Sequence, residues 1–560
     1  MKKTLVPILC AAILLVGFSI YWITGRTAVS DGAALVPDRT MVFAMLPDLP
    51  RAAMRWPKTS LGLVSAEPEV VAFFEKPMEV WNASSGNSRV TALLGDLRPG
   101  RVFFAIPSAQ DTKLRTLLGF QYWGEKKAFD AAIQDLRARI ANDQPVTVET
   151  QSHQGVEIQS STLGNGEALY TAASSRWGFL SNDLDTLRDA LERLHGRAAS
   201  PALAADADYQ KALTSLDPEA DFLAFLRPDA AIDFLLNIGS QMGAQPDPAQ
   251  LEQVRRARSV AYSIRLDGPA VRDSLVFSIP DSQPAPALGR ETLRLTSPTT
   301  LAFFHFAVDA QKTLGMLKAV GLDQRLGDSA ARVIDRLEES AGLLGTEGGL
   351  ALAWPSDAML PRAVAGISIN DPTGAEALLN EFREMVPGMT VSDTDGLKIY
   401  SIPALRSPFS DPGFAFTPTL AVGSSSSEDL VDILKHPDVA NLTANPAFAA
   451  LIPEFEAANE SFGFVDTRAI FERAFPMLRQ VIVFGSSLLP GASDLIDPDK
   501  IPSTESIAKH LIPFAYSQSR DTNGVIIRSS GPVSMNHAAV ILAIGSAAAL
   551  PPGVFLRPQS

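Results

Sequence analysis

The stretch Asp393-Thr-Asp395-Gly396 has the residue types that begin a calcium-binding loop, with alternating carboxylates before a glycine. The later ligand positions of an EF-hand loop are missing. An internal repeat, described below, places Ser152-His-Gln-Gly155 at the equivalent position. Only the glycine recurs, and a glycine supplies the positive φ that a hairpin turn requires. We therefore predict a turn here and no metal site.

Four consecutive serines, from Ser424 to Ser427, could supply a nucleophile or cradle a phosphate. The equivalent place in the repeat contains Asn182, and an acidic residue follows three positions after Asn182 in one copy and after Ser425 in the other. This spacing is typical of a helix capping box. The chain has neither a G-x-S-x-G nucleophile elbow nor a Walker-type glycine loop. We predict that Asn182 and Ser425 cap helices.

The histidines and the cysteine offer no recognisable catalytic or metal-ligating pattern. None of the six histidines stands at a spacing that puts two ligands on one helical face. His195, His436 and His510 each end a predicted helix, where a cationic side chain suits the exposed carbonyls. The single cysteine, Cys10, lies in an apolar N-terminal run, so the folded part has no thiol for a disulfide, a zinc site or a nucleophile. We predict no catalytic residue, no metal and no cofactor.

An internal repeat supplies the elements that position these residues. Each copy runs through an opening strand, a strand pair, an amphipathic helix, a hairpin with glycine at its turn, a strand leading into a capped helix, and a closing strand pair. The closing pairs begin Val260-Ala-Tyr-Ser263 and Phe514-Ala-Tyr-Ser517. The principal helices are expected at 125–140 and 183–195 in the first copy and at 374–385 and 426–436 in the second.

The first unit is predicted over residues 36–280 and the second over 296–534. The linker between them, residues 281–295, begins with a Pro- and Gly-rich stretch, as a domain boundary should. Paired strands with short turns, alternating with helices, indicate an antiparallel sheet with helices on one face. The expected fold class is α+β, with two tandem copies of an antiparallel-sheet-plus-helices unit behind an N-terminal transmembrane segment.

The second copy carries a Pro/Gly-rich insertion at residues 406–416 that the first copy lacks. Its phenylalanines, Phe409, Phe414 and Phe416, are a candidate apolar interaction loop for a partner, a lipid or the membrane surface. Alternatively, they pack beneath the loop as a small core cluster. The second copy also has an apolar helix at 477–489, which could line a ligand cavity or be buried between the units.

Both ends of the chain are apolar. Lys2 and Lys3 precede a run over residues 5–23, about the 20 residues needed to span a bilayer. Residues 1–30 are therefore expected to be a signal anchor, with a cleavable signal peptide as the alternative. The C-terminal tail, 535–560, contains a shorter run at 538–556, which is either a buried closing helix or a second membrane segment. The bulk of the chain is expected to be extracytoplasmic.

The net charge of −14 disfavours nucleic acid as a partner, because an acidic surface repels phosphate backbones. Phenylalanine, with 29 residues, far outnumbers tyrosine and tryptophan, so most of the aromatic content is of the type that fills cores.

The chain resembles an uncharacterised bacterial family of exported, membrane-anchored proteins, catalogued as a domain of unknown function. The similar segments are Val36-Pro-Asp with Met45-Leu-Pro-Asp-Leu49, Glu67-Pro-Glu69 with Phe73-Phe74, Arg176-Trp-Gly-Phe with Ser181-Asn182, and Ile501-Pro with Lys509-His510-Leu511. The resemblance implies an inner-membrane location with the bulk of the chain in the periplasm, and it brings no activity or site residues.

Three functions follow as expectations. The first is a non-enzymatic, membrane-anchored envelope protein that binds or scaffolds, with an envelope protein or a lipid as partner. The second is a carrier of an apolar ligand such as a lipid. The third is a hydrolase whose serine, histidine and acid converge only in the folded structure.

Overall fold

The computed structural model describes residues 31–85, 95–110, 113–141, 146–162, 166–241, 255–311, 315, 335–355, 358–385, 388–394, 396–407, 410–435, 440–488 and 497–536. No helix within these ranges is both long and apolar enough to cross a membrane. The expected anchor at 1–30 and the apolar run at 538–556 lie outside the described residues.

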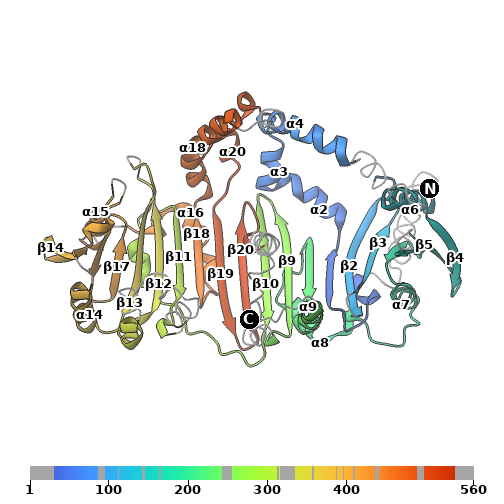
Figure 1. The fold of residues 1–560 in the computed structure, drawn as a ribbon, viewed down its shortest axis with the longest axis horizontal. Coiled ribbons are helices and arrows are strands. Elements are labelled where there is room, and N and C mark those ends of the chain that lie inside the picture. Colours follow the sequence, from blue (N-terminus) through green and yellow to red (C-terminus); the bar gives the residue numbers. More distant parts are fainter. Residues whose placement is uncertain are drawn as a thin grey trace, which may run out of the picture.

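Twenty strands form one continuous antiparallel sheet (Figure 1). The first half of the sheet comprises β1 (Val42–Leu46), β2 (Pro99–Gln110), β3 (Lys113–Tyr122), β4 (Thr147–His153), β5 (Val156–Thr162), β6 (Ala168–Ser174), β7 (Trp177–Ser181), β8 (Phe222–Leu226), β9 (Ser259–Asp267) and β10 (Ala270–Ser278). The second half comprises β11 (Ala302–Ala307), β12 (Leu344–Ala353), β13 (Arg362–Ile369), β14 (Thr390–Thr394), β15 (Leu397–Ser401), β16 (Gly413–Phe416), β17 (Leu420–Ser424), β18 (Ser461–Val465), β19 (Phe514–Asp521) and β20 (Gly524–Gly531).

The strands of each half pair in the same order. The first half runs β4-β5-β6-β7-β3-β2-β1-β8-β9-β10. The second runs β14-β15-β16-β17-β13-β12-β11-β18-β19-β20. The halves meet where β10 pairs with β20, and Ser274 lies opposite Arg528 at this joint. Each joining strand is therefore the last strand of its own half.

One face of the sheet, here called the packed face, holds the core. Alternate residues of each strand point to it, so Phe43 and Phe103 are buried there and their rings stack at 5.9 Å. In the first half α7 (Leu184–Leu194) and α8 (Ala207–Thr214) cover this face through Leu187 and Tyr209. In the second half it is covered by α15 (Ser427–Lys435), α16 (Pro446–Ala449) and α17 (Ile452–Phe455).

The opposite face, here called the open face, is only partly covered. In the first half α6 (Lys126–Ala141) packs on it through Phe129 and Ile133, against Phe120 and Leu180. In the second half α14 (Pro372–Met385) lies beside it. The sequence predicted helices on one face only, and the position of α6 corrects this, because its apolar stripe is buried against residues of the other face.

An arch of helices connects the upper ends of the two halves (Figure 1). It contains α2 (Leu49–Arg55), α3 (Ser60–Ser65) and α4 (Pro68–Ser85) from the first half, and α18 (Thr467–Leu488) and α20 (Thr504–Ala508) from the second. Within it, Glu67 Oε1 lies 2.6 Å from His510 Nε2 and 2.9 Å from Lys509 Nζ. The bonds to His510 and Lys509 lower the pKa of Glu67.

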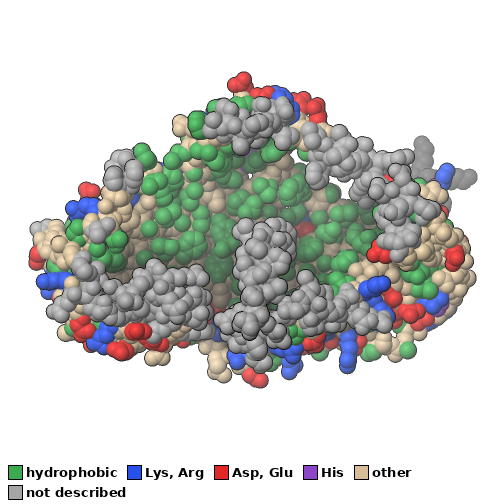
Figure 2. Space-filling view, viewed as in Figure 1, with side chains coloured by type: hydrophobic (Ala, Val, Ile, Leu, Met, Phe, Trp, Pro, Cys, Tyr) green, Lys and Arg blue, Asp and Glu red, His purple; other side chains and the backbone are tan. Residues whose placement is uncertain are grey.

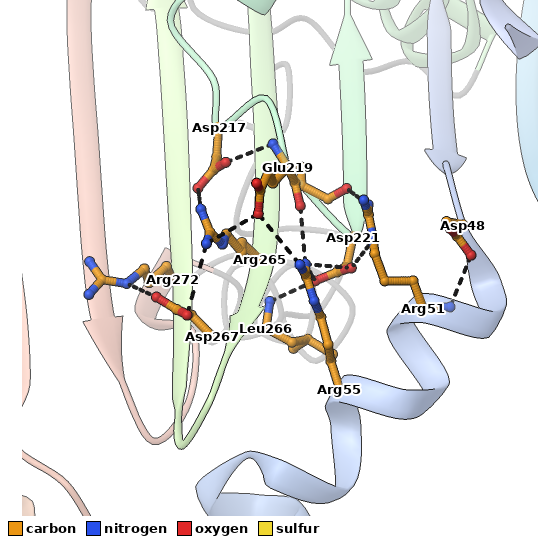
Figure 3. Close-up of polar contacts among 11 residues, drawn as sticks. Asp48, Arg51, Arg55, Asp217, Glu219, Asp221, Arg265, Leu266, Asp267 and Arg272 are labelled. Atoms are coloured by element: carbon orange, nitrogen blue, oxygen red, sulfur yellow. Dashed lines mark hydrogen bonds and ion pairs between the residues drawn. The ribbon is translucent and has the colours of Figure 1, made fainter.

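The base of the arch is fixed to the sheet by a charged network (Figure 3). Asp221, just before β8, is buried and contacts Arg51 Nε at 3.1 Å and Arg55 Nη1 at 3.0 Å. The same carboxylate accepts a hydrogen bond of 2.9 Å from the backbone amide of Leu266. Because its oxygens are bonded to both arginines and the sheet, Asp221 orients α2.

The mixture of helices and antiparallel strands confirms the α+β prediction, but the predicted capping residues are shifted. Asp183 caps α7, accepting a 2.8 Å bond from Thr186 N, and Ser426 accepts from Asp429 N at 3.3 Å. Asn182 and Ser425 instead bond the neighbouring strand, as acceptors for Thr116 N at 2.8 Å and Ala363 N at 2.9 Å. Because the side chains of Asn182 and Ser425 accept from the neighbouring strand, the cap of each helix falls to the next residue.

An apolar groove on the open face is the candidate functional site

The polar motifs singled out in the sequence have structural roles. Asp393 Oδ1 accepts a hydrogen bond of 2.8 Å from Gly396 N, which closes the predicted turn, and Gly396 has a φ of 84°. The φ of Gly155 in the equivalent hairpin is 86°. No group of three or more potential metal ligands occurs within the described residues.

Of the histidines that the structure describes, His153 contacts Glu192 and His510 contacts Glu67. His305 is fully buried, and its Nδ1 lies 2.6 Å from Thr292 Oγ1. Burial lowers the pKa of His305 to about 4, so it is neutral at pH 7. His436 and His537 lie outside the described residues.

One serine–histidine contact bears on the hydrolase alternative. Ser174 Oγ lies 3.3 Å from His195 Nε2 at the surface, and His195 Nδ1 lies 2.8 Å from the carbonyl oxygen of Leu191. A backbone carbonyl therefore stands where a hydrolase has its acid. This pair lies at the exposed end of α7, so it is better explained as a helix terminus.

One feature of the open face that could bind a ligand is an apolar groove in the second half, with a cavity volume of 580 Å³. It crosses β11, β12, β13, β17 and β16. Every lining residue is apolar or glycine: Phe306, Val308, Gly348, Gly349, Leu350, Ala365, Gly366, Ile367, Leu379, Phe414, Ala415, Phe416, Ala421, Val422 and Gly423. Figure 2 shows hydrophobic side chains over much of the hollowed sheet face below the arch.

Strand register gives the groove a shallow floor between two aromatic walls. Across the floor, Leu350 of β12 pairs with Ala365 of β13 and Ala365 pairs with Gly423 of β17, so small residues lie side by side on β13 and β17. Phe306 on β11 forms one wall and Phe414 on β16 the other. Both phenylalanines keep about two fifths of their surface exposed, at 40% each. Apolar side chains so exposed at a concave surface are typical of a binding site.

Two glycines leave room for the rings of Phe306 and Phe414 to lie over the floor of the groove. A Cβ on Gly348 would lie 2.5 Å from Cε2 of Phe306, and one on Gly423 would lie 3.0 Å from Cδ1 of Phe414. Any larger residue at Gly348 or Gly423 would therefore collide with the ring beside it. The width of the groove depends on these two glycines.

The predicted interaction residues are placed differently from the expectation. Phe414 and Phe416 lie on strand β16 and not in a loop, and both line the groove. Phe409 lies outside the described residues. The groove's floor was missed in the sequence, because alanines and glycines spread over three strands give no local signal. Comparison of the two halves could have revealed it, since Gly423 stands on β17 where β7 has Leu180.

The apolar helix expected at 477–489 is the outer part of α18. Met477, Leu478, Val481 and Phe484 are exposed. The sequence left open whether this helix was buried between the units, and the exposure of these four side chains argues against it.

No protein-family model matches the chain, and no curated protein matches it. One solved structure, described as "Structure of crystal form I of TP0453", is similar over 46% of this chain and 81% of its own, with 9% identity and a TM-score of 0.25. A likeness at that score supports no argument about this chain's fold or function.

Proposed function

We propose that the protein is a non-enzymatic carrier that holds an apolar chain, such as the acyl chain of a lipid, in the groove of its second half. The single observation that carries the proposal is the groove itself, whose lining is wholly apolar while its walls stay exposed. Exposing such a surface to water is unfavourable, and a hydrocarbon chain would relieve that cost.

The energetics suit a reversible carrier. Each buried methylene contributes about 0.8 kcal/mol, so ten methylenes in the groove contribute about 8 kcal/mol. Before the cost of immobilising the chain, that corresponds to a dissociation constant of about 1 μM. A linear chain also fits the shape, because the floor is shallow and the aromatic walls stand on opposite sides of it.

The test is binding of a fluorescent fatty acid to the full-length protein and to the variant Ala365→Leu. Leucine is the residue that the first half has at the equivalent position, Leu118, so the sheet accommodates it. We expect the substitution to displace about two methylenes of ligand and weaken binding about tenfold. Adding Gly423→Leu should weaken it further.

The matched control is Ala44→Leu, on the open face of the first half. Its equivalent in the second half is Phe304, so a larger side chain is tolerated there, and binding should be unchanged. Equal binding by Ala365→Leu and the unsubstituted protein, with both fully folded, would reject the groove as the site. Native mass spectrometry of protein extracted from its own envelope would identify a bound molecule.

The location and the duplication belong to the same proposal. We propose that residues 1–30 anchor the protein in the bacterial inner membrane with the remainder in the periplasm, where a lipid carrier would act. We also propose that the chain arose by tandem duplication of one α+β unit, 36–280 and 296–534. The identical strand order of the two halves supports this, and protease protection of the described part in spheroplasts tests the location.

A further inference from the structure

After β20 the chain returns to the open face, at the joint between the two halves. Ser534 and Asn536 are both buried there and bind Asp273 of β10. Asp273 points to the open face, because it alternates with residues such as Val276 that pack in the core. The last described residues therefore lie at the middle of the sheet.

Neutral donors surround this buried carboxylate. Asp273 Oδ1 accepts from Ser529 Oγ at 2.6 Å and from Asn536 Nδ2 at 2.9 Å, and Oδ2 accepts from Ser534 Oγ. Tyr262 OH lies 3.4 Å from Oδ2 and 2.8 Å from Ser534 Oγ. Hydrogen bonds to a buried carboxylate are strong and costly to lose. They fix the point from which the C-terminal tail departs.

The tail that follows this cluster is apolar. Met535 and Asn536 are already helical. The following residues, 538–550, contain no charged side chain. Thirteen helical residues would extend about 20 Å, which is short of the roughly 30 Å of a bilayer core. Beside the departure point, Leu275 and Ile527 face each other across the joint on the open face.

We propose that residues 538–550 lie against the open face along the β10–β20 joint and cover Leu275 and Ile527. The occupant is this chain's own tail, since the Asp273 cluster fixes its start at that surface and its length as a helix falls short of a bilayer core. The proposal is independent of the groove, which lies on β11–β17, and holds whether or not a lipid binds there.

The test is the reactivity of single cysteines introduced in the full chain, after Cys10→Ser, as Leu275→Cys or Ile527→Cys. A polar maleimide should modify both slowly. In the same proteins carrying Ile544→Asp, a charge within the tail should release it and raise both rates at least tenfold. Ending the chain after Asn536 should have the same effect, and Leu61→Cys, exposed on α3, should react equally in every background.

The proposal would be overturned if the maleimide modification rates of Leu275→Cys and Ile527→Cys were the same with and without each of the two changes to the tail. Protection of these cysteines that decreases when the protein is diluted would also overturn it, because a second copy of the chain would then cover the joint. Quenching of a fluorophore on Ser546→Cys by brominated lipids in vesicles would overturn it in favour of a membrane segment. Concentration-independent protection without quenching is the expected result.

Discussion

The open face is built from strands paired in the same order in the two halves, yet helix α6 packs on part of it in the first half and an apolar groove crosses it in the second. In the first half Leu118 pairs with Leu180, whereas in the second Ala365 pairs with Gly423. On the neighbouring strand the second half has the larger side chain, because Phe414 stands where the first half has Thr171. The same strand order is therefore compatible with large side chains on this face or with the apolar groove between Phe306 and Phe414.

The helix above each surface enlarges this difference. Phe129 of α6 lies with its ring centroid 5.8 Å from those of Phe120 and Tyr122. A Cβ on Gly178 would lie 2.5 Å from Phe129, so the ring fits closely over that glycine. In the second half the corresponding helix α14 presents Leu379 to the groove. The comparison teaches that side-chain sizes, together with the helix packed above them, decide whether this surface is filled or left as an apolar groove.

Removing the buried ring of Phe129 in the first half should have the largest effect on stability. Phe129→Ala should lower the free energy of unfolding by about 3–5 kcal/mol, because a buried aromatic ring is lost and a cavity remains. Denaturant unfolding followed by circular dichroism measures this. The variant should not gain fatty-acid binding, since Leu118 and Leu180 still fill the floor. A loss below about 1 kcal/mol would contradict the description of Phe129 as a core residue.

The second prediction concerns His305, which occupies the position of Met45 in the first half. Its pKa falls to about 4 on burial, against about 6.5 in an unfolded chain. Between these values the unfolded state binds a proton that the folded state does not. The contribution of His305 to the free energy of unfolding is therefore fully present above pH 6.5. It decreases by about 3 kcal/mol as the pH falls to 4.

His305→Met should remove that part of the pH dependence, at the cost of leaving the buried hydroxyl of Thr292 without its partner. Urea unfolding at pH 7 and pH 4, compared between this variant and the unsubstituted protein, provides the measurement. The same pH dependence of the free energy of unfolding in both proteins would contradict a lowered pKa of His305 in the folded state.

The smallest effect on stability should come from the wall of the groove. Phe414→Ala should change the free energy of unfolding by less than about 1 kcal/mol, because the ring is 40% exposed. Its effect on ligand affinity should be larger, about tenfold for the loss of one aromatic contact surface. Thermal unfolding and fatty-acid titration of one preparation separate the two quantities. A destabilisation as large as that of Phe129→Ala would make Phe414 a core residue and weaken the proposed function.

Local patterns in the sequence identified most individual elements. The hairpins turning at Gly155 and Gly396, and the helices ending at His195 and before His436, are present with boundaries within a few residues of those predicted. Such features depend on neighbouring residues, as turns, caps and amphipathic stripes do.

What the sequence by itself determined is the α+β composition, the succession of strands and helices along the chain, and the roles of its turn residues, because each of these is encoded over a few neighbouring positions. Only the tertiary structure decided that β10 joins β20 in one sheet, that Phe414 and Phe416 stand on a strand, and that α6 covers one surface while the other stays hollow. These outcomes depend on register between strands far apart in sequence and on the volume left by side chains on different strands. No local pattern of residues carries that information.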